Sequence, residues 1–435
     1  MFHSSTITDL FDFLKHSPTP WHAVAEMVRR LDRAGFIALD ETAGWTLEPG
    51  KRYYCTRADG ALVAFQLPQG KLESLRMIGA HTDSPALRLK PHAVQGAAGW
   101  AQLGVEVYGG ALLAPWFDRD LALAGRVYVR NSKGQLIKRL LHVERPVAII
   151  PSLAIHLDRE ANQGKVLNAQ TQMAPVLWQT GNDQPLPTIE TLIKRWLTEQ
   201  YGAEEVEIVD HELSLYDAQP AAQLGLDGEL ISSGRLDNLL SCYCGLQALM
   251  ESDGRQGALF IGNDHEEIGS SSTGGAQGTL LGDIVSRLAE AVGDASAEGR
   301  IRLLQASRLV SCDNAHAVHP NYPDKHDARH QPALNGGPVI KVNASQRYAT
   351  NAATGALFRD ICREAEVPVQ TFVSRADMPC GSTIGPLTAT RTGVPTLDIG
   401  LAQWAMHSIR ETAGARDPDY LIRALTVFCN REVLL

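Results

Sequence analysis

The hydrophobic residues near the amino terminus recur at helical spacing and predict two helices. Leu10, Phe11 and Leu14 fall on one helical face, and the same spacing continues through residues 21–31. Between these runs, residues 17–20 (SPTP) contain two prolines, and a proline cannot donate the backbone hydrogen bond that a helix interior requires. We therefore expect one helix on each side of this segment.

Short apolar runs and helical patterns alternate over much of the remaining chain. The apolar runs that predict buried strands lie at residues 72–80, 258–261, 309–312, 339–342, 369–373 and 394–399. Helical spacing occurs after Asp237 and again at residues 419–432. Strands separated by helices are typical of a largely parallel sheet that is covered on both faces. The predicted fold class is therefore α/β, with a mixed, largely parallel sheet sandwiched between helices.

The pattern changes between residues 93 and 230. Residues 105–108 and 126–130 alternate hydrophobic and polar side chains, as half-buried strands do, and residues 131–134 (NSKG) are a turn signal. We predict that residues 93–230 form a β-rich domain. This domain would be inserted into an α/β domain made of residues 1–92 and 231–435.

Composition narrows the classes of partner and compartment. The 435 residues carry a formal net charge of −9, which argues against non-specific binding to nucleic acid or to anionic membranes. We find no run of about 18 apolar residues that would span a membrane, and residues 1–15 lack the features of a secretory signal. The seven cysteines form no C-x-x-C pair, which favours reduced thiols in a cytoplasmic protein over a disulfide framework.

Two adjacent glutamates, Glu266 and Glu267, follow the apolar run at residues 258–261. Carboxylates this close to one another resist joint ionisation unless a positive charge holds them. A bound dication would remove this conflict, because one glutamate could ligate the ion while the other handles protons. The rest of the chain must then supply the remaining ligands.

Further candidate ligands follow other predicted strands. His81 and Asp313 come directly after two of these strands. His407 lies in the loop after residues 394–399, and Asp237 directly precedes a helix. Ligands of open α/β sheets bind outside the carboxyl ends of the strands. A mixed set of imidazoles and carboxylates suits zinc, manganese or cobalt better than calcium, and it is large enough for two ions about 3.5–4 Å apart.

Each of these residues also has a purely structural explanation. Asp237 alone could cap its helix, and the two glutamates could lie in a solvated loop. A histidine after a strand is commonly a hydrogen-bonded residue at the rim of the core. Separate structural uses would not gather all of them at one edge of one sheet, so the metal-site hypothesis depends on the predicted strands.

Seven short motifs are spread over nearly the whole chain. They lie at residues 79–85 (GAHTDSP), 235–238 (RLDN), 264–270 (DHEEIGS), 312–317 (CDNAHA), 346–351 (QRYATN), 378–386 (MPCGSTIGP) and 405–411 (AMHSIRE). This set closely resembles the aspartyl aminopeptidases of the dinuclear zinc exopeptidase clan. The resemblance implies a zinc-exopeptidase fold and a metal-dependent aminopeptidase that removes Asp and Glu from the amino termini of peptides.

The resemblance also implies a site for two divalent metal ions, with zinc as the first choice and manganese or cobalt as alternatives. The five implied ligands are His81 and Asp313 for one ion, Glu267 and His407 for the other, and Asp237 as the bridge.

Two further residues receive roles beside the metals. Glu266 would be the general base, taking a proton from a zinc-bound water and returning it to the leaving amine. Asp83 would fix the orientation of the His81 imidazole. The clan pattern also implies a cis peptide bond between Asp237 and Asn238.

Four residues would contact the substrate. His316, Lys341 and Tyr348 would line its site, with Lys341 as the positive partner of the acidic side chain. His156, in the inserted domain, resembles a family histidine that reaches the active site of a neighbouring subunit, with direct metal contact as the alternative. Relatives dimerise through the inserted β-rich domain and often assemble into dodecamers.

Two other functions stay open. Another hydrolase of the same clan, such as a deacylase or a carboxypeptidase, would share the metal ligands but carry a basic residue for a substrate carboxylate. A non-enzymatic shell or binding protein would be expected to lack the base or a ligand, and here all of these residues are present.

Overall fold

The computed structural model describes residues 4–164, 166–180, 185–203 and 206–434 and divides the chain into two compact units. The first unit comprises Met1–Asp83, Ala221–Met406 and Glu411–Leu435, and the second comprises Ser84–Pro220 and His407–Arg410. The sequence analysis draws this division at residues 92/93 and 230/231. The structure draws it earlier at both points, because β5 (Ala86–Ala97) pairs within the second unit and β11 (Ala222–Leu224) pairs within the first.

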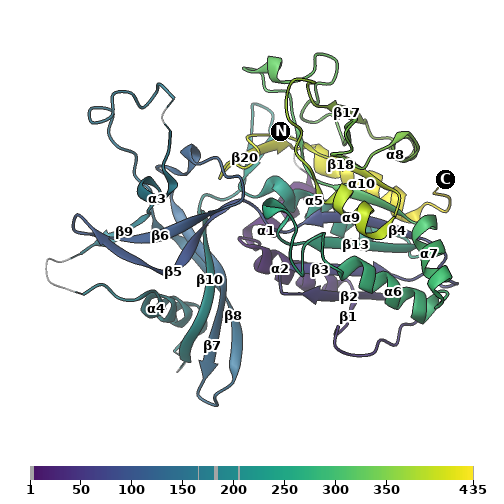
Figure 1. The fold of residues 1–435 in the computed structure, drawn as a ribbon, viewed down its shortest axis with the longest axis horizontal. Helices are drawn as coiled ribbons and strands as arrows, with labels where there is room; N and C mark the ends of the chain where they lie inside the picture. The colour runs from purple at the N-terminus through teal and green to yellow at the C-terminus, as the bar shows by residue number, and fades with distance from the viewer. Residues whose placement is uncertain (1–3, 165, 181–184, 204–205, 435) are drawn as a thin grey trace. The chain divides into compact units, whose positions relative to one another are not determined.

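The first unit contains a nine-stranded mixed sheet (Figure 1). In spatial order its strands are β1 (Ile37–Ala38), β2 (Arg52–Arg57), β3 (Ala61–Gln66), β13 (Gly257–Asn263), β4 (Leu75–His81), β14 (Arg308–Cys312), β18 (Thr396–Gly400), β16 (Val339–Val342) and β17 (Gln370–Val373). The central strands β13, β4, β14 and β18 are parallel, whereas β3 and β16 join them in antiparallel fashion. All six predicted strands lie in this sheet, which confirms the predicted fold class.

Helices cover both faces of this sheet (Figure 1). On one face pack α1 (Ser5–Lys15), α2 (Pro20–Arg33), α5 (Leu236–Glu251), α8 (Ala352–Glu364) and α10 (Asp417–Asn430). On the other face pack α6 (Leu280–Val292) and α7 (Ala297–Ala306). Ile78 and Phe260 belong to the first hydrophobic cluster and their neighbours Met77 and Leu259 to the second, because successive side chains of a strand point to opposite faces.

The break between the first two helices lies at the predicted position. α1 ends at Lys15 and α2 begins at Pro20, where a proline needs no helical hydrogen-bond partner. The side chain of Thr19 accepts the backbone N–H of His22 and caps the second helix. The two predicted helices are therefore confirmed, together with the reason for their separation.

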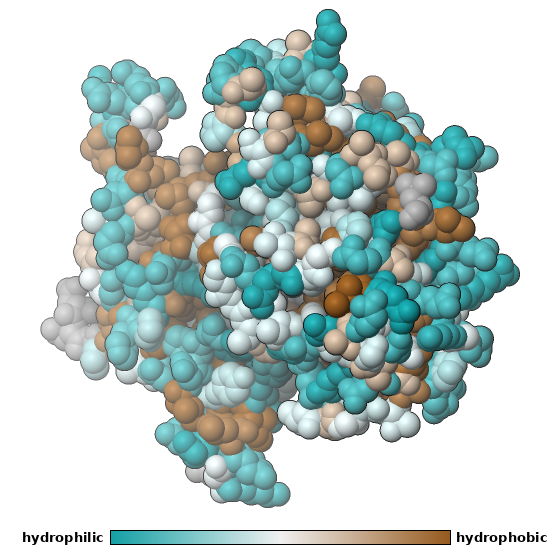
Figure 2. Space-filling view, turned by 45° about the vertical axis from the view of Figure 1, so that its right-hand side comes forward, coloured by the Kyte–Doolittle hydropathy of each residue, from teal (hydrophilic) through white to brown (hydrophobic). Residues whose placement is uncertain are grey.

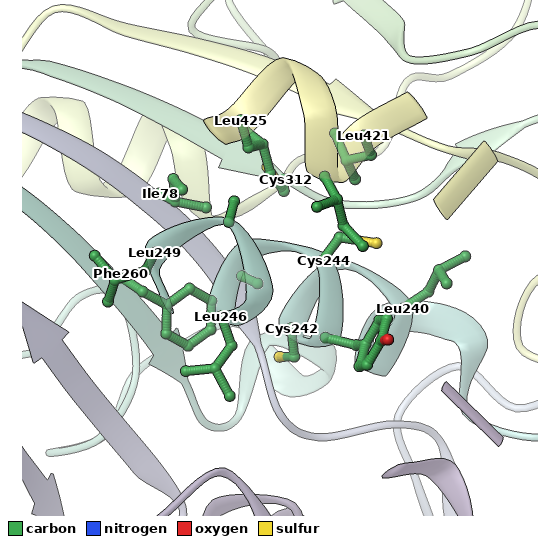
Figure 3. Packing of buried hydrophobic residues seen from close by; sticks show 14 of the residues in the cluster. Ile78, Leu240, Cys242, Cys244, Leu246, Leu249, Phe260, Cys312, Leu421 and Leu425 are labelled. Atoms are coloured by element: carbon green, nitrogen blue, oxygen red, sulfur yellow. The ribbon is translucent and has the colours of Figure 1, made fainter. Parts of the chain in front are cut away.

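The helix α5 lies close against the sheet. Figure 3 shows leucine and cysteine side chains of α5 in one buried cluster with Ile78, Phe260 and the α10 residues Leu421 and Leu425. A Cβ atom at Gly245 would lie 2.9 Å from Ile78 Cγ2 and 3.0 Å from the Phe260 ring. The short distance between helix and sheet therefore depends on the missing side chain of Gly245.

The helix α9 (Ile384–Thr392) packs against β4, β14 and β18 of the large sheet. A smaller five-stranded sheet completes the first unit. In spatial order its strands are β11, β12 (Leu230–Ser233), β20 (Glu411–Gly414), β19 (Ala402–Trp404) and β15 (Ala315–His316). The strands β19 and β20 are antiparallel neighbours, and β20 also pairs with β12. This sheet brings the segment before α5 next to the segment that follows the loop of His407 in the sequence.

The second unit is built on a six-stranded antiparallel sheet. Its spatial order is β8 (Leu136–Ala148), β7 (Leu121–Asn131), β10 (Val206–Asp217), β5, β6 (Trp100–Tyr108) and β9 (Val176–Gln179). The helix α4 (Ile189–Tyr201) contributes Ile193 and Trp196 to the core of this unit, and a short helix, α3 (Ala169–Gln172), lies beside β6. The predicted β-rich character of this region agrees with the sheet.

The described residues include no helix with both the length and the apolar character that crossing a membrane requires. On the face shown in Figure 2, hydrophobic residues form separate patches among hydrophilic ones.

The close approach at Gly245 gives a test of the packing. We expect Gly245→Ala to lower the free energy of unfolding by about 1–3 kcal/mol, because the new methyl group overpacks a site with no room for it. The matched control is Gly282→Ala in α6, where no atom lies within 4 Å of the new Cβ. This control should be neutral or stabilising by up to about 1 kcal/mol. Urea unfolding of the two variants measures the difference, and equal midpoints would contradict the packing argument.

Candidate metal centre

Three neighbouring parallel strands end at the same edge of the large sheet. β4 ends at His81, which pairs in register with Asn263 at the end of β13. β14 ends at Cys312 and is followed directly by Asp313. The loop after β13 carries Glu266 and Glu267 in a short 3-10 helix. The sheet therefore places the predicted ligands outside the carboxyl ends of its strands, as expected for an open α/β sheet.

The side chains at this edge converge on the imidazole of His81. Its Nε2 atom lies 3.4 Å from Asp237 Oδ1, 3.5 Å from Asp313 Oδ1 and 3.9 Å from Glu266 Oε2. Potential ligand atoms of His81, Asp237 and Asp313 lie within 4.8 Å of one another, and so do those of His81, Glu266 and Glu267. Within the first unit, the structure thus assembles one histidine and four carboxylates at one site.

Asp83 contacts three members of this cluster. Its carboxylate accepts the backbone N–H of Glu266 at 3.0 Å and that of Glu267 at 3.1 Å. The same carboxylate lies 3.4 Å from Nδ1 of His81, on the side of the ring opposite Asp237. Asp83 is fully buried, and its backbone carbonyl oxygen lies still closer to His81 Nδ1, at 3.1 Å. Its predicted role in orienting the imidazole stays a prediction.

The peptide bond between Asp237 and Asn238 is cis, as the sequence analysis expects. Asp237 lies at the start of α5 with φ −84° and ψ 106°, outside the helical region. The Asn238 side chain donates a hydrogen bond to the carbonyl oxygen of Cys312 at 2.8 Å, which ties this turn to the end of β14.

The charges of the cluster shift its pKa values strongly. Burial raises the pKa of Glu266 to about 8, with His81 opposing the shift and Asp313 adding to it. Burial and the neighbouring Asp237 also hold the pKa of Glu267 far above its usual range. Burial would raise the pKa of Asp313, but Lys341 and His81 outweigh burial and hold that pKa below the usual range. The pKa of His81 is raised despite its burial, because Asp237, Asp313 and Asp83 stabilise the charged ring.

These residues fit divalent metal ions. The cluster with Asp83 contains five carboxylates, and Lys341 Nζ lies 3.2 Å from Asp313 Oδ2. Such a concentration of negative charge at a buried edge is costly unless positive charge compensates it. Imidazole nitrogen together with carboxylate oxygen is a donor set that zinc accepts.

A family comparison agrees with this geometry. A sequence model of the aminopeptidase I zinc metalloproteases (M18) matches residues 13–429. The "Probable M18 family aminopeptidase 2" of Pseudomonas savastanoi pv. phaseolicola is 52% identical over 421 residues, which are 96% of each chain. That of Pseudomonas fluorescens strain SBW25 is 53% identical over 421 residues, again 96% of each chain.

This chain belongs to the M18 aminopeptidase family. It is a metallo-aminopeptidase, in agreement with the prediction from its motifs.

Solved structures of M18 aminopeptidases share its fold. The structure described as the Ape4 and Nbr1 complex has a TM-score of 0.93 at 38% identity and covers 98% of this chain and 85% of that chain. The M18 aminopeptidase of Thermotoga maritima has a TM-score of 0.84 at 26% identity and covers 98% of this chain and 95% of that chain. The S. cerevisiae mApe1 dodecamer has a TM-score of 0.85 at 27% identity and covers 98% and 96%.

Two of the predicted substrate residues of this M18 aminopeptidase line a pocket of about 280 Å³ in the first unit. His316 and Tyr348 form part of its wall, together with the cationic residues Lys325 and Arg375. Lys341 lies next to this pocket: its Nζ is 5.4 Å from the centre of the Tyr348 ring, and the residue is 3% exposed. Tyr348 therefore stands between the pocket and the lysine that contacts the metal cluster.

Two predicted site residues lie in the second unit. His156 is exposed, in a turn between β8 and α3. His407 belongs to the four residues that group with this unit, and its Nδ1 lies 3.1 Å from the carbonyl oxygen of Gly110. The roles of both histidines stay predictions.

The sequence analysis missed Asp398, a buried residue of β18. Its carboxylate accepts the backbone N–H of Ala349 at 2.6 Å and the hydroxyl of Thr383 at 2.7 Å. It thereby holds the two segments that carry Tyr348 and Cys380, both of which line the pocket. The signal in the sequence was a single aspartate inside an apolar strand, where an unpaired carboxylate would be costly.

The contacts of Asp83 generate a prediction for metal binding. In Asp83→Asn, one carboxylate oxygen becomes an amide donor that faces a backbone N–H, so the glutamates lose their common support. We expect zinc affinity, measured by competition with a chelator, to fall about 10–100-fold.

The control for this change is Asp40→Asn. Asp40 also accepts a backbone N–H, from Thr42 at 2.8 Å, but it is exposed and remote from the cluster. Equal zinc affinity in both variants would show that Asp83 does not support the site.

Proposed function

We propose that this M18 aminopeptidase removes acidic residues from the amino termini of peptides, with two divalent metal ions, zinc in the first place, and Glu266 as the general base. The observation that supports acidic specificity best is the charge of the pocket. Lys325 and Arg375 line it with three histidines, and no Asp or Glu is among its described lining residues. The wall itself therefore offers neutral or positive side chains to an acidic residue, while Asp377 and Asp324, which are not among the lining residues, pair with Arg375 and Lys325.

The ligands of the two ions would be the residues that the motifs imply: His81 and Asp313, Glu267 and His407, with Asp237 between the ions. When bound, the ions would lower the pKa of a coordinated water and polarise the scissile carbonyl. The clustering of His81, Asp237, Glu267 and Asp313 supports this assignment. The contribution of His407 is part of the proposal.

Glu266 would move the proton. Its carboxylate is half-buried at the edge of the cluster, and its backbone is fixed by Asp83. From there it takes a proton from the attacking water and returns it to the nitrogen of the leaving amine. Glu267, which follows it directly, is left to ligate a metal ion, so the pair divides the two tasks.

Lys341 would recognise the acidic side chain of the substrate together with Tyr348 and His316. Without metal its ammonium neutralises Asp313. With Asp313 as a metal ligand, the ammonium would be able to direct its remaining hydrogen bonds toward a substrate carboxylate beside the Tyr348 ring. A charge-assisted hydrogen bond of this kind is worth about 1.5–3 kcal/mol.

We further propose self-association, with dimers formed through the second unit and assembled into a dodecamer, in a cytoplasmic protein. A related structure is described as the S. cerevisiae mApe1 dodecamer. Leu153, Ile155 and Leu157 of the second unit are 54%, 49% and 75% exposed and flank His156, which suits a segment that a partner covers. All seven cysteines are free, which fits a reducing compartment.

The proton-transfer role predicts the behaviour of Glu266→Gln. We expect this variant to keep its bound metal and its fold while turnover falls about 10²–10⁴-fold, because the amide cannot accept the proton. Metal analysis and steady-state kinetics measure the two effects. Glu267→Gln is the comparison and should lose metal as well as activity; near-normal turnover of Glu266→Gln would exclude it as the base.

Substrate choice is tested with a matched series of peptides. We expect Asp- and Glu-leading peptides to be hydrolysed at least about tenfold faster than Ala-leading ones, all activity to vanish on chelation, and N-acyl amino acids to stay intact. Lys341→Met should reduce the preference for acidic peptides about 10–100-fold, as the loss of one charge-assisted hydrogen bond implies.

The variant Lys325→Met distinguishes the contributions of the two lysines, Lys325 and Lys341, to the preference for acidic peptides. If Lys325→Met abolishes the acidic preference and Lys341→Met does not, Lys341 is not the specificity residue. Faster hydrolysis of N-acyl amino acids than of peptides would instead favour a deacylase.

A further inference from the structure

A chain of buried polar side chains connects the segments that carry Asp237 and Asp313. Glu411 Oε2 accepts the backbone N–H of Asp237 at 2.9 Å, and Gln403 Nε2 donates to Glu411 Oε1 at 3.4 Å. Asn314 Nδ2 donates to Gln403 Oε1 at 2.9 Å. Glu411, Gln403 and Asn314 are each 1% exposed, so bulk water does not compete for these hydrogen bonds.

Asn314 connects this row of hydrogen-bonded side chains to the helix α5. Its Nδ2 also donates to the carbonyl oxygen of Leu236 at 2.8 Å, and Ser241 Oγ donates to its Oδ1 at 3.4 Å. Leu236 directly precedes Asp237, and Asn314 directly follows Asp313. The side chains therefore bind the backbone on both sides of Asp237 and hold it against the residue that follows Asp313.

Gln403 and Glu411 belong to the small five-stranded sheet. β19 carries Gln403 and β20 begins with Glu411, and the two strands are paired, with Gln403 opposite Ala413. Glu411 also pairs with Ser233 of β12, shortly before Asp237 in the chain. The position of Glu411 is thus fixed by backbone pairing that does not involve the metal ligands.

We propose that Glu411, Gln403 and Asn314 are positioning residues that hold Asp237 and Asp313 at the separation that metal binding needs. The inference rests on the proposed metal-dependent function, since it assigns these residues a role in the affinity for the ions. The chain acts through the backbone of Asp237 and through Asn314. Glu411 and Asn314 are not among the residues that line the proposed substrate pocket, whereas Gln403 forms part of its wall, so Glu411 is the residue that tests the positioning role without altering the pocket.

The direction of every hydrogen bond in the chain follows from the carboxylate of Glu411. An ionised carboxylate only accepts, so Gln403 must turn its NH₂ group toward Glu411 and its carbonyl oxygen toward Asn314. Asn314 in turn points its NH₂ group at Gln403 and at the carbonyl oxygen of Leu236. If Glu411 is replaced by a side chain that donates, the neighbouring amide of Gln403 must therefore accept a hydrogen bond where it donated one before.

This polarity allows a test by exchange of the two side chains. In Glu411→Gln the new oxygen still accepts from Asp237, but its NH₂ group faces the NH₂ group of Gln403. In Gln403→Glu two carboxylates face each other. In the double variant Glu411→Gln/Gln403→Glu the chain is complete again, because residue 411 donates to the carboxylate at 403, which also accepts from Asn314.

The readout is the dissociation constant for zinc of the metal-stripped protein, determined by competition with a chromophoric chelator. We expect each single variant to bind zinc about 10–100-fold more weakly and the double variant to recover most of that loss. Thermal unfolding of the stripped proteins shows whether each variant is folded. Hydrolysis at saturating zinc should recover in Glu411→Gln, which leaves the pocket wall unchanged, and a general folding defect would not allow this recovery.

The matched control is Gln66→Glu. Gln66 is also a 1% exposed glutamine of the first unit, but it pairs with Ala258, at the end of β13 remote from Asn263. This change introduces the same buried carboxylate and should leave zinc affinity unchanged.

Three outcomes separate the possibilities. Unchanged zinc affinity in both single variants, or no recovery in the double variant, overturns the positioning role while the metal-dependent function stands. If the unaltered protein itself binds no zinc and keeps its activity after chelation, the proposed function fails first. Weaker binding in the single variants with recovery in the double variant supports the positioning chain.

Discussion

The structure depends on holding several carboxylates together at one buried edge of a sheet. Asp83, Asp237 and Asp313 are buried there beside two half-buried glutamates, and like charges at this distance repel strongly where water is scarce. Lys341 and the imidazole of His81 offset part of the repulsion. Divalent metal ions would offset the remaining repulsion between the carboxylates.

The fold around the cluster supplies the rigidity that such a site requires. Parallel neighbours β4, β13 and β14 bring residues from three distant parts of the sequence to one edge. Asp83 fixes the loop after β13 through backbone N–H groups, and Glu411 fixes the turn at Asp237 in the same way. The protein thus uses carboxylates both as candidate metal ligands and as supports for the backbone that carries them.

The carboxylate cluster and the pocket lined by His316 and Tyr348 are linked by Lys341. This lysine touches Asp313 on one side and lies beside the Tyr348 ring on the other, and Tyr348 lines a pocket without described acidic residues. Negative charge is therefore concentrated at the strand ends, and the ammonium of Lys341 lies between this cluster and the ring of Tyr348.

Local sequence patterns were enough to predict part of the fold and the family. Helical spacing and the prolines at residues 17–20 gave α1 and α2, the apolar runs gave the six strands, and the motifs gave the family. The contacts of Lys341 with Asp313 and of Glu411 with Asp237 and Gln403 were not predictable from these patterns. These contacts join residues far apart in the chain (174 positions for Asp237 and Glu411), and no periodicity or motif spacing encodes which buried polar groups will face each other. The division between the two units, too, was set by strand pairing, because a change in local pattern marks only roughly where one sheet ends and another begins.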